Sequence, residues 1–390
     1  MPVGYLFSVG VVAICTAVAL VGPRPAQSTR SHPSFWLTYL INEQPFLAFY
    51  WLLAITVFAI VQGDLASPGG KAACGVAILT AIGLAVLVWR ALRAGPALER
   101  ALADGLGPDW RARTDAVDPA STGSGRWWPI GRLLAAPFLV RRRDVVRVAN
   151  LRYGDAGKRN MLDVYHQRAR PVGGPTLVFL HGGGFRSGHK NREGRVLLNR
   201  LASQGWVCVS ANYRLEPEAG FPSPLIDVKQ VIAWVRAHAG NYGGDPRTLF
   251  VAGSSAGAHL ASMAGLTPND RMFQPGFESA DTSITAVICF YGYYGRLGGP
   301  HDATSSPLDR LHRDAPPFFV IHGDKDSLIP VGDARTFVAR LRALSTRPVV
   351  YAELPGAQHA FDLFHSVRYA KVVNAVEAFA TWVRASQRQE

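Results

Sequence analysis

The 390-residue chain has 41 Lys and Arg against 28 Asp and Glu, a formal net charge of +13, and 48% hydrophobic residues. That length accommodates one large domain and an additional segment. Much of the positive charge lies between residues 90 and 147, beside apolar stretches, so we expect anionic lipid headgroups as its partner and no nucleic acid. The cysteines have neither metal-ligand spacing nor a paired pattern, which indicates buried, inert thiols: Cys15, Cys74, Cys208 and Cys289.

Three apolar stretches, 5–21, 46–61 and 72–89, occupy the front of the chain. Stretches of this length can cross a bilayer as helices, and Trp and Tyr residues near their ends are typical of the membrane interface. A signal peptide is the alternative for the first stretch, although no Lys or Arg precedes it and no clear cleavage site follows. A buried globular hairpin is the alternative for the other two. We expect residues 1–94 to form a transmembrane region with about three helices.

Charge in the connecting loops predicts the orientation of these spans. The loop after the first stretch carries two arginines, and three more follow the third stretch by residue 100. The loop between the second and third stretches balances Asp64 against Lys71. Since cytoplasmic loops carry an excess of Lys and Arg, we expect an external N-terminus and a cytoplasmic catalytic domain in a multi-pass protein.

Residues 95–143 form a connecting segment rich in Gly, Pro, Ala and Arg, with Ser-Thr-Gly-Ser-Gly at 121–125 as a flexible joint. Residues 127–140 then begin with two tryptophans, continue as an apolar run and precede three arginines at 141–143. This composition suits a segment lying on the membrane surface. A cap packed on the catalytic domain is the alternative, and the two are compatible.

From residue 144 to the end, strand-like and helix-like stretches alternate. The helical stretches include 225–238, 334–344 and 367–386. Several predicted strands are short apolar runs, as expected for parallel strands buried on both faces, and the full set is 145–153, 161–165, 176–180, 206–210, 248–252, 286–291, 317–321 and 349–354. We therefore expect an α/β domain with a mostly parallel sheet flanked by helices, and a site beyond the carboxyl ends of its strands.

Gly-Ser-Ser-Ala-Gly at 253–257 lies between a predicted strand and a helix-compatible stretch at 258–264. This is the G-x-S-x-G pattern in the setting it requires, a sharp strand-to-helix turn that exposes one serine above the sheet. Small neighbours are needed because the turn is strained and the helix packs close to the strand. A plain Gly/Ser turn is the alternative. We predict that Ser255 is a nucleophile.

A second motif, His-Gly-Gly-Gly at 181–184, directly follows the strand predicted at 176–180. Consecutive glycines let backbone N–H groups point at one spot without a side chain blocking a substrate oxygen. We predict an oxyanion hole formed by the amides of Gly183, Gly184 and Ala256. His181 is expected to support this loop by hydrogen bonding, because in this fold the catalytic histidine comes from near the C-terminus.

The acid and the base are expected after later strands, in the chain order Ser, Asp, His. Two carboxylates follow the strand at 317–321, and we choose Asp326 as the acid and Asp324 as an acceptor that fixes the loop. His359 follows the strand at 349–354 and is the predicted base. Its nearest rival, His365, is expected on the next helix. The acid orients the imidazole and stabilises it once it is charged.

These motifs, with Asn-Tyr-Arg-Leu at 212–215 and Gly-Gly-Asp-Pro at 243–246, resemble the hormone-sensitive-lipase-type α/β-hydrolases over about residues 145–386. The usual elbow of that family is closer to Gly-Asp-Ser-Ala-Gly-Gly, whereas here Ser254 replaces the acid and Ala258 and His259 follow the second glycine. The elbow is more similar to the branch that holds prenylcysteine methylesterases and arylformamidases. Membrane spans ahead of a hydrolase domain are also similar to the prenylcysteine methylesterase arrangement.

The resemblance implies a membrane-anchored serine carboxylesterase or lipase that needs no metal or organic cofactor. Two alternatives stay open: an arylformamidase or amidase that uses the same residues, and a non-catalytic binding protein that keeps the hydrolase fold. The motifs indicate ester chemistry but give neither the acyl chain nor the alcohol of the substrate.

Overall fold

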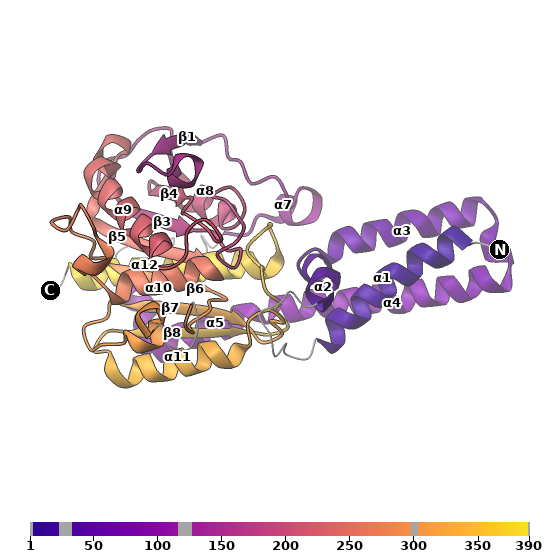
Figure 1. Cartoon of the computed structure of the whole chain (residues 1–390). Coiled ribbons are helices and arrows are strands. Elements are labelled where there is room, and N and C mark those ends of the chain that lie inside the picture. The colour runs from indigo at the N-terminus through magenta and orange to yellow at the C-terminus, as the bar shows by residue number, and fades with distance from the viewer. Residues whose placement is uncertain (1–2, 23–32, 116–126, 298–302, 389–390) are drawn as a thin grey trace.

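A computed structural model describes residues 3–22, 33–115, 127–297 and 303–388. The molecule is elongated, with helices from the front of the chain forming a bundle at one end and an α/β domain at the other (Figure 1). The joint predicted at 121–125 lies outside the described residues.

The bundle consists of α1 (Val3–Val21), α2 (Pro33–Glu43), α3 (Pro45–Val61) and α4 (Pro68–Leu92). Helix α3 starts with a proline, and the Ser67 hydroxyl caps α4 by accepting from the Gly70 amide at 3.0 Å. Two helical segments of the described chain, Val3–Val21 and Pro68–Leu106, are long and apolar enough to span a membrane. A third span results if α2 and α3, which meet at a bend of 85°, count as one.

Helix α4 leads directly into α5 (Ala94–Leu106), which packs against the α/β domain. Apart from the turn residue Arg93, the two form one helical run of 39 residues, Pro68–Leu106. One face of α5 is buried through Leu98 and Leu102, and a Cβ on its Gly105 would come within 2.9 Å of the Val350 backbone. Because α5 continues α4, this close approach attaches the bundle to β8 (Val349–Leu354), the edge strand that contains Val350.

The α/β domain is built on one eight-stranded sheet in the order β1-β2-β4-β3-β5-β6-β7-β8. Pairing is antiparallel where β2 meets β1 and β4, and parallel from β4 through β8. The strands are β1 (Val145–Arg152), β2 (Met161–Gln167), β3 (Gly174–Leu180), β4 (Val207–Ala211), β5 (Gly244–Ser254), β6 (Ala286–Phe290), β7 (Phe318–Gly323) and β8 (Val349–Leu354). The mostly parallel sheet predicted from the sequence is confirmed, and all eight strands overlap the predicted runs.

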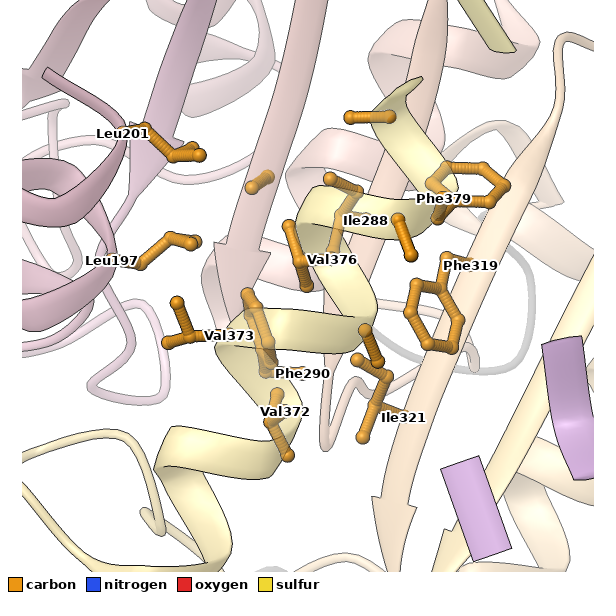
Figure 2. Packing of buried hydrophobic residues seen from close by; sticks show 14 of the residues in the cluster. Leu197, Leu201, Ile288, Phe290, Phe319, Ile321, Val372, Val373, Val376 and Phe379 are labelled. Carbon is orange, nitrogen blue, oxygen red and sulfur yellow. The ribbon is translucent and has the colours of Figure 1, made fainter. Parts of the chain in front are cut away.

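Helices cover both faces of the sheet and enclose two apolar cores. The first core contains α5, α8 (Arg195–Ser203) and α12 (Val367–Gln387), and the second contains α9 (Ser223–His238), α10 (Ala256–Leu266) and α11 (Val331–Leu344). Figure 2 shows Val373 and Val376 of α12 beside Phe290 of β6 in the first core. Burial on both faces explains why the strands are continuous apolar runs.

Two short helices precede the sheet, α6 (Trp110–Asp115) and α7 (Ile130–Ala135). The segment around α7 packs on the α/β domain, since the Asn374 side chain bonds the Trp127 backbone and the Lys371 ammonium lies 4.3 Å from the Trp128 ring centroid. It also leaves Ile130 and Phe138 more than half exposed. The segment therefore packs on the α/β domain, as expected for a cap. It also exposes apolar side chains, as expected for a segment lying on the membrane surface.

Candidate active site

The turn between β5 and α10 forces Ser255 into a strained conformation. Its φ is 55° and its ψ is −117°, in the region that L-residues with a side chain rarely adopt. Space around the turn is minimal: a Cβ on Gly253 would lie 2.3 Å from the Gly257 backbone, and one on Gly257 would lie 2.1 Å from the Leu180 carbonyl oxygen. This crowding explains the glycines on each side of Ser255, which is itself partly exposed.

The predicted acid and base meet in the structure. Asp326 lies in the turn after β7, and His359 lies in the loop after β8; these strands are parallel neighbours. Their carboxyl ends therefore bring the two loops together, and the His359 Nδ1 lies 2.6 Å from the Asp326 Oδ2. Both side chains are buried. A carboxylate on Nδ1 fixes the tautomer that leaves Nε2 free to accept a proton.

Further contacts hold Asp326 ionised in this position. The backbone amides of Leu328 and Ile329 each donate to its Oδ1 at 2.9 Å, and the His322 Nε2 lies 3.3 Å from its Oδ2. Burial alone would raise the pKa of Asp326, but His359 and His322 outweigh it and hold that pKa well below the usual range. The carboxylate can therefore orient His359 without taking its proton.

Backbone contacts connect the serine to the histidine side of the site. The Ser255 amide donates to the Phe290 carbonyl at 2.9 Å, and the next residue, Tyr291, places its ring centroid 4.3 Å from that of His359. Among the described residues, no hydrogen bond joins the Ser255 hydroxyl to His359. In free enzymes such contacts are often long and tighten only when substrate is bound.

The His-Gly-Gly-Gly loop abuts the serine. A Cβ on Gly182 would come within 3.1 Å of the Ser255 Cβ. The φ angles are +124° at Gly183 and +61° at Gly184, so both occupy backbone regions that favour glycine. Within the described part of the chain, the amides of Gly183, Gly184 and Ala256 donate no hydrogen bond, so they are available to a ligand oxygen.

Three secondary predictions can be compared with the structure. The His181 Nδ1 lies 2.7 Å from the Gly182 carbonyl oxygen, and its ring stacks on Tyr213, which fits the expected support of the loop. The Asp324 Oδ1 accepts from the Gly356 amide at 2.7 Å, so its role as a loop-fixing acceptor is confirmed. His365 lies just before α12, so the expectation that it belongs to that helix was wrong.

Sequence reasoning missed a second buried carboxylate beside the site. Asp362 accepts from the Ser254 hydroxyl at 2.6 Å and from the Tyr291 hydroxyl. Burial raises the pKa of Asp362, and the two donors oppose this rise. The signal was the missing acid at position 254, since a short hydroxyl there leaves room for a carboxylate supplied by another loop.

Sequence reasoning also missed that α2 reaches the site. The Phe35 ring on α2 lies edge-on to the His359 imidazole, with centroids 6.2 Å apart and planes at 77°. The hydroxyl of Thr38, one turn further along, accepts from the Gln358 side chain at 3.3 Å. No pattern within 33–43 marks it as part of a catalytic site. As for metal binding, no cluster of three or more His, Cys, Asp or Glu suited to an ion occurs among the described residues.

The mostly parallel sheet, the strained serine turn after β5 and the Asp–His pair after β7 and β8 define an α/β-hydrolase. Solved structures share this fold: an esterase from Thermogutta terrifontis superposes with a TM-score of 0.53 at 23% identity, covering 59% of this chain and 92% of that one. A carbohydrate esterase from gut microbiota gives a TM-score of 0.51 at 20% identity, covering 60% of this chain and 96% of that one.

Sequence comparison identifies the family. The BD-FAE family matches residues 162–295. LipM of Mycobacterium tuberculosis, named "Probable carboxylic ester hydrolase", is 38% identical over 97% of this chain and 93% of its own length. Esterase LipQ of the same organism is 37% identical over 75% of each chain. The chain belongs to the same family of α/β-hydrolase carboxylic ester hydrolases as LipM and LipQ, so it hydrolyses a small-molecule ester.

Proposed function

We propose that this protein is a membrane-anchored serine carboxylesterase whose triad is Ser255, Asp326 and His359. The Ser255 hydroxyl attacks the ester carbonyl carbon while the His359 Nε2 takes its proton. Asp326 holds the imidazole through Nδ1 and stabilises the imidazolium. The tetrahedral oxyanion accepts hydrogen bonds from the amides of Gly183, Gly184 and Ala256.

The second half of the cycle uses the same groups. His359 returns its proton to the departing alcohol oxygen as the carbonyl–oxygen bond breaks, which leaves an acyl group on Ser255. A water molecule then loses a proton to His359 and attacks the acyl carbon, and collapse of this second intermediate releases the acid and restores the Ser255 hydroxyl.

One observation carries the proposal: the 2.6 Å contact between the His359 Nδ1 and the Asp326 Oδ2. These residues lie 33 positions apart, in loops that follow neighbouring parallel strands. The Ser255 turn also follows the carboxyl end of a strand of this parallel set, so all three residues lie at the same end of the strands. The chain order is Ser, Asp, His, as α/β-hydrolases require.

We propose further that residues 1–94 anchor the enzyme through three spans: α1, the bent pair α2–α3, and α4. Apolar side chains exposed on the bundle support this, among them Phe7, Phe58 and Leu79. Residues 95–143 then form an interfacial and capping segment, and residues 144–390 form the hydrolase domain. The arginines that end the first and third spans favour a cytoplasmic location for that domain.

A lipophilic ester is the substrate class that this arrangement favours, because anchoring places the site near the bilayer. The elbow residues Ser254, Ala258 and His259 also make prenylcysteine methyl esters and aryl formamides worth comparing. A chain-length series of p-nitrophenyl acyl esters should be run beside a prenylcysteine methyl ester and N-formylkynurenine. Faster turnover of N-formylkynurenine than of every ester would overturn the ester proposal in favour of a formamidase.

The serine mechanism is tested with Ser255→Ala and with Ser279→Ala as a matched control, since Ser279 is exposed on the surface. A fluorophosphonate probe should label the wild type and Ser279→Ala but not Ser255→Ala. Hydrolysis by Ser255→Ala should fall by about 10⁴-fold or more, as when a triad member is removed. Labelling or full activity in Ser255→Ala would refute the mechanism.

Orientation is tested with Ser279→Cys, because the native cysteines are buried in the α/β domain or lie within the proposed spans. A membrane-impermeant maleimide should label this variant only after intact cells are permeabilised. Labelling of intact cells would put the catalytic domain outside.

A further inference from the structure

Helix α2 lies where the bundle meets the α/β domain (Figure 1). It is too short to span a membrane by itself, and its outward face carries apolar side chains such as Trp36 and Leu40. Its other face is buried and largely polar, with Thr38, Asn42 and Glu43 each no more than 5% exposed. Buried polar groups need partners, and each of these three has one in the loop that carries His359 or at the start of α12.

Asn42 in the last turn of α2 and Gln44, just after that helix, hold this loop on both sides of His359. The Asn42 Nδ2 donates to the Gly356 carbonyl at 2.9 Å, and the Gln44 Nε2 donates to the His365 carbonyl at 2.9 Å. The contacts span more than 300 positions of sequence. They fix the backbone of the loop shortly before and shortly after the imidazole.

A buried ion pair fastens the same end of α2 to the start of α12. Glu43 pairs with Arg368, and its other carboxylate oxygen accepts from the Ser366 hydroxyl at 2.7 Å. The Arg368 side chain is fully buried. Separating α2 from this position would leave a buried charge without its partner, which is strongly destabilising. The helix is therefore held against the loop.

Gln358 connects α2 to the backbone beside both Asp326 and His359. Its Oε1 accepts from the His359 amide at 2.9 Å and from the amide of Ser327, the residue after Asp326, at 2.7 Å. Its Nε2 donates to the Thr38 hydroxyl of α2 at 3.3 Å. The Thr38 hydroxyl thus helps to set the orientation of a carboxamide that bonds the backbone beside the acid and the base.

Two aromatic rings limit the motion of the imidazole. Tyr291 follows β6, with its ring centroid 4.3 Å from that of His359, and the Phe35 ring of α2 meets the imidazole edge-on at 6.2 Å. Phe35 is only 8% exposed, so its ring excludes water from that side. One of the two rings therefore comes from the front of the chain.

We propose that α2 is a positioning element of the active site, in which Thr38 acts through Gln358 and Phe35 acts directly on the imidazole of His359. The helical bundle and the hydrolase domain then form one catalytic unit. This inference rests on the proposed role of His359 as the base. It predicts an effect on the rate of the chemical step and little effect on the binding of small esters.

The test uses the full-length protein in detergent, with Phe35→Ala and Thr38→Val as variants. Thr38→Val keeps the side-chain shape and removes the hydroxyl, and Thr38→Ser restores the hydroxyl. Leu40→Ala is the matched control on α2, because Leu40 is 42% exposed. Active serines are counted by end-point fluorophosphonate labelling, and kcat per labelled serine and KM are measured with p-nitrophenyl acetate.

We expect Phe35→Ala to lower kcat per labelled serine about 10- to 100-fold, since misplacement of a catalytic group by about 1 Å has effects of that size. Thr38→Val should lower it about threefold or more, while KM changes less than threefold in both variants. Thr38→Ser and Leu40→Ala should stay within about twofold of the wild type.

Two results would overturn the inference. The first is that Phe35→Ala and Thr38→Val keep a wild-type kcat per labelled serine. The second is that they lose labelled serines and thermal stability together while the rate per remaining site is unchanged, as a purely structural role requires. Failure of the proposed mechanism itself is distinguishable, because the wild-type protein would then not be labelled at Ser255.

Discussion

The Ser254 hydroxyl donates a 2.6 Å hydrogen bond to the carboxylate of Asp362, a residue 108 positions later in the chain. The usual elbow of the hormone-sensitive-lipase-type hydrolases carries an aspartate where this chain has Ser254. Here the carboxylate next to the nucleophile comes from the histidine loop, and the elbow supplies the hydroxyl. The pair joins the turn that holds Ser255 to the loop that holds His359.

Restoring the usual elbow in the single variant Ser254→Asp should destabilise the protein. The substitution places a second buried carboxylate against Asp362, and like charges without a cation between them are costly, by about 3 kcal/mol or more. Adding Asp362→Ser recreates a carboxylate–hydroxyl pair and should recover about 2 kcal/mol of that loss. Unfolding midpoints of the wild type, both single variants and the double variant measure this coupling. Strictly additive effects would mean that the two side chains do not act as a pair.

Asp326→Asn should lower kcat by about 10³–10⁴-fold, because a neutral amide neither fixes the productive tautomer of His359 nor stabilises its charged form. Asp324→Asn is the matched control two residues earlier: its carboxylate accepts from the Gly356 amide, and an amide oxygen can do the same. That control should lose less than about tenfold. The kcat of each variant with p-nitrophenyl acetate distinguishes the two carboxylates. A larger loss of kcat in Asp324→Asn than in Asp326→Asn would make Asp324 the acid.

The two glycines of the oxyanion loop should differ in their tolerance of alanine. A Cβ on Gly183 would lie 2.0 Å from the Ser187 carbonyl oxygen, whereas a Cβ on Gly184 meets nothing within 4 Å. Gly183→Ala must therefore displace the loop and should lower kcat by about 10²–10³-fold, the usual effect of losing one oxyanion donor. Gly184→Ala incurs only the strain of its positive φ and should lower kcat less. Equal losses of kcat in the two variants would contradict this prediction, because the open space around Gly184 would then not make that position more tolerant of alanine.

Stability should depend on pH through Glu193. Burial outweighs the favourable effect of Arg192 and raises the pKa of Glu193 from 4.5 to about 7. The folded state therefore holds the proton more tightly than the unfolded chain, so this contribution is present below about pH 4.5 and is lost as the pH rises through about 7. Glu193→Gln cannot ionise, and its free energy of unfolding should decline less than that of the wild type between pH 5 and pH 8, by about 2 kcal/mol.

The matched control for that measurement is Glu278→Gln, because Glu278 is fully exposed and the Gly276 amide already favours its ionised form. It should show the same dependence on pH as the wild type between pH 5 and pH 8. If Glu193→Gln also follows the wild type, Glu193 is ionised in the folded protein throughout this range.

The sheet and the Asp–His pair were accessible from sequence because each depends on local signals. A strand such as β6 is a short, wholly apolar run, and the loops after parallel strands meet at one sheet edge whatever the intervening helices do. The order of Ser255, Asp326 and His359 along the chain then leaves few assignments.

The position of α2 and the Ser254–Asp362 pair could not be predicted from the sequence, because they depend on long-range contacts between polar residues. Residues 33–43 look like a connection between two apolar stretches, and the bonds that seat α2 reach Gly356 and Arg368, more than 300 positions away. Asp362 likewise has no neighbour in sequence that reveals its partner Ser254. Hydrophobic periodicity identifies elements but does not say which buried polar groups satisfy one another.

The helical run from α4 into α5, broken only by the turn residue Arg93, has a consequence for how substrate is acquired. Helix α4 alone is about 37 Å long at 1.5 Å per residue, more than the roughly 30 Å of a bilayer's hydrocarbon core, and α5 continues it to the β8 edge of the sheet. With no loop at this junction, the catalytic domain of the proposed membrane enzyme keeps a fixed height above the lipid. Encounter with a lipid-dissolved ester then becomes a search in two dimensions, governed by lateral diffusion and by how far the substrate's ester group rises out of the leaflet.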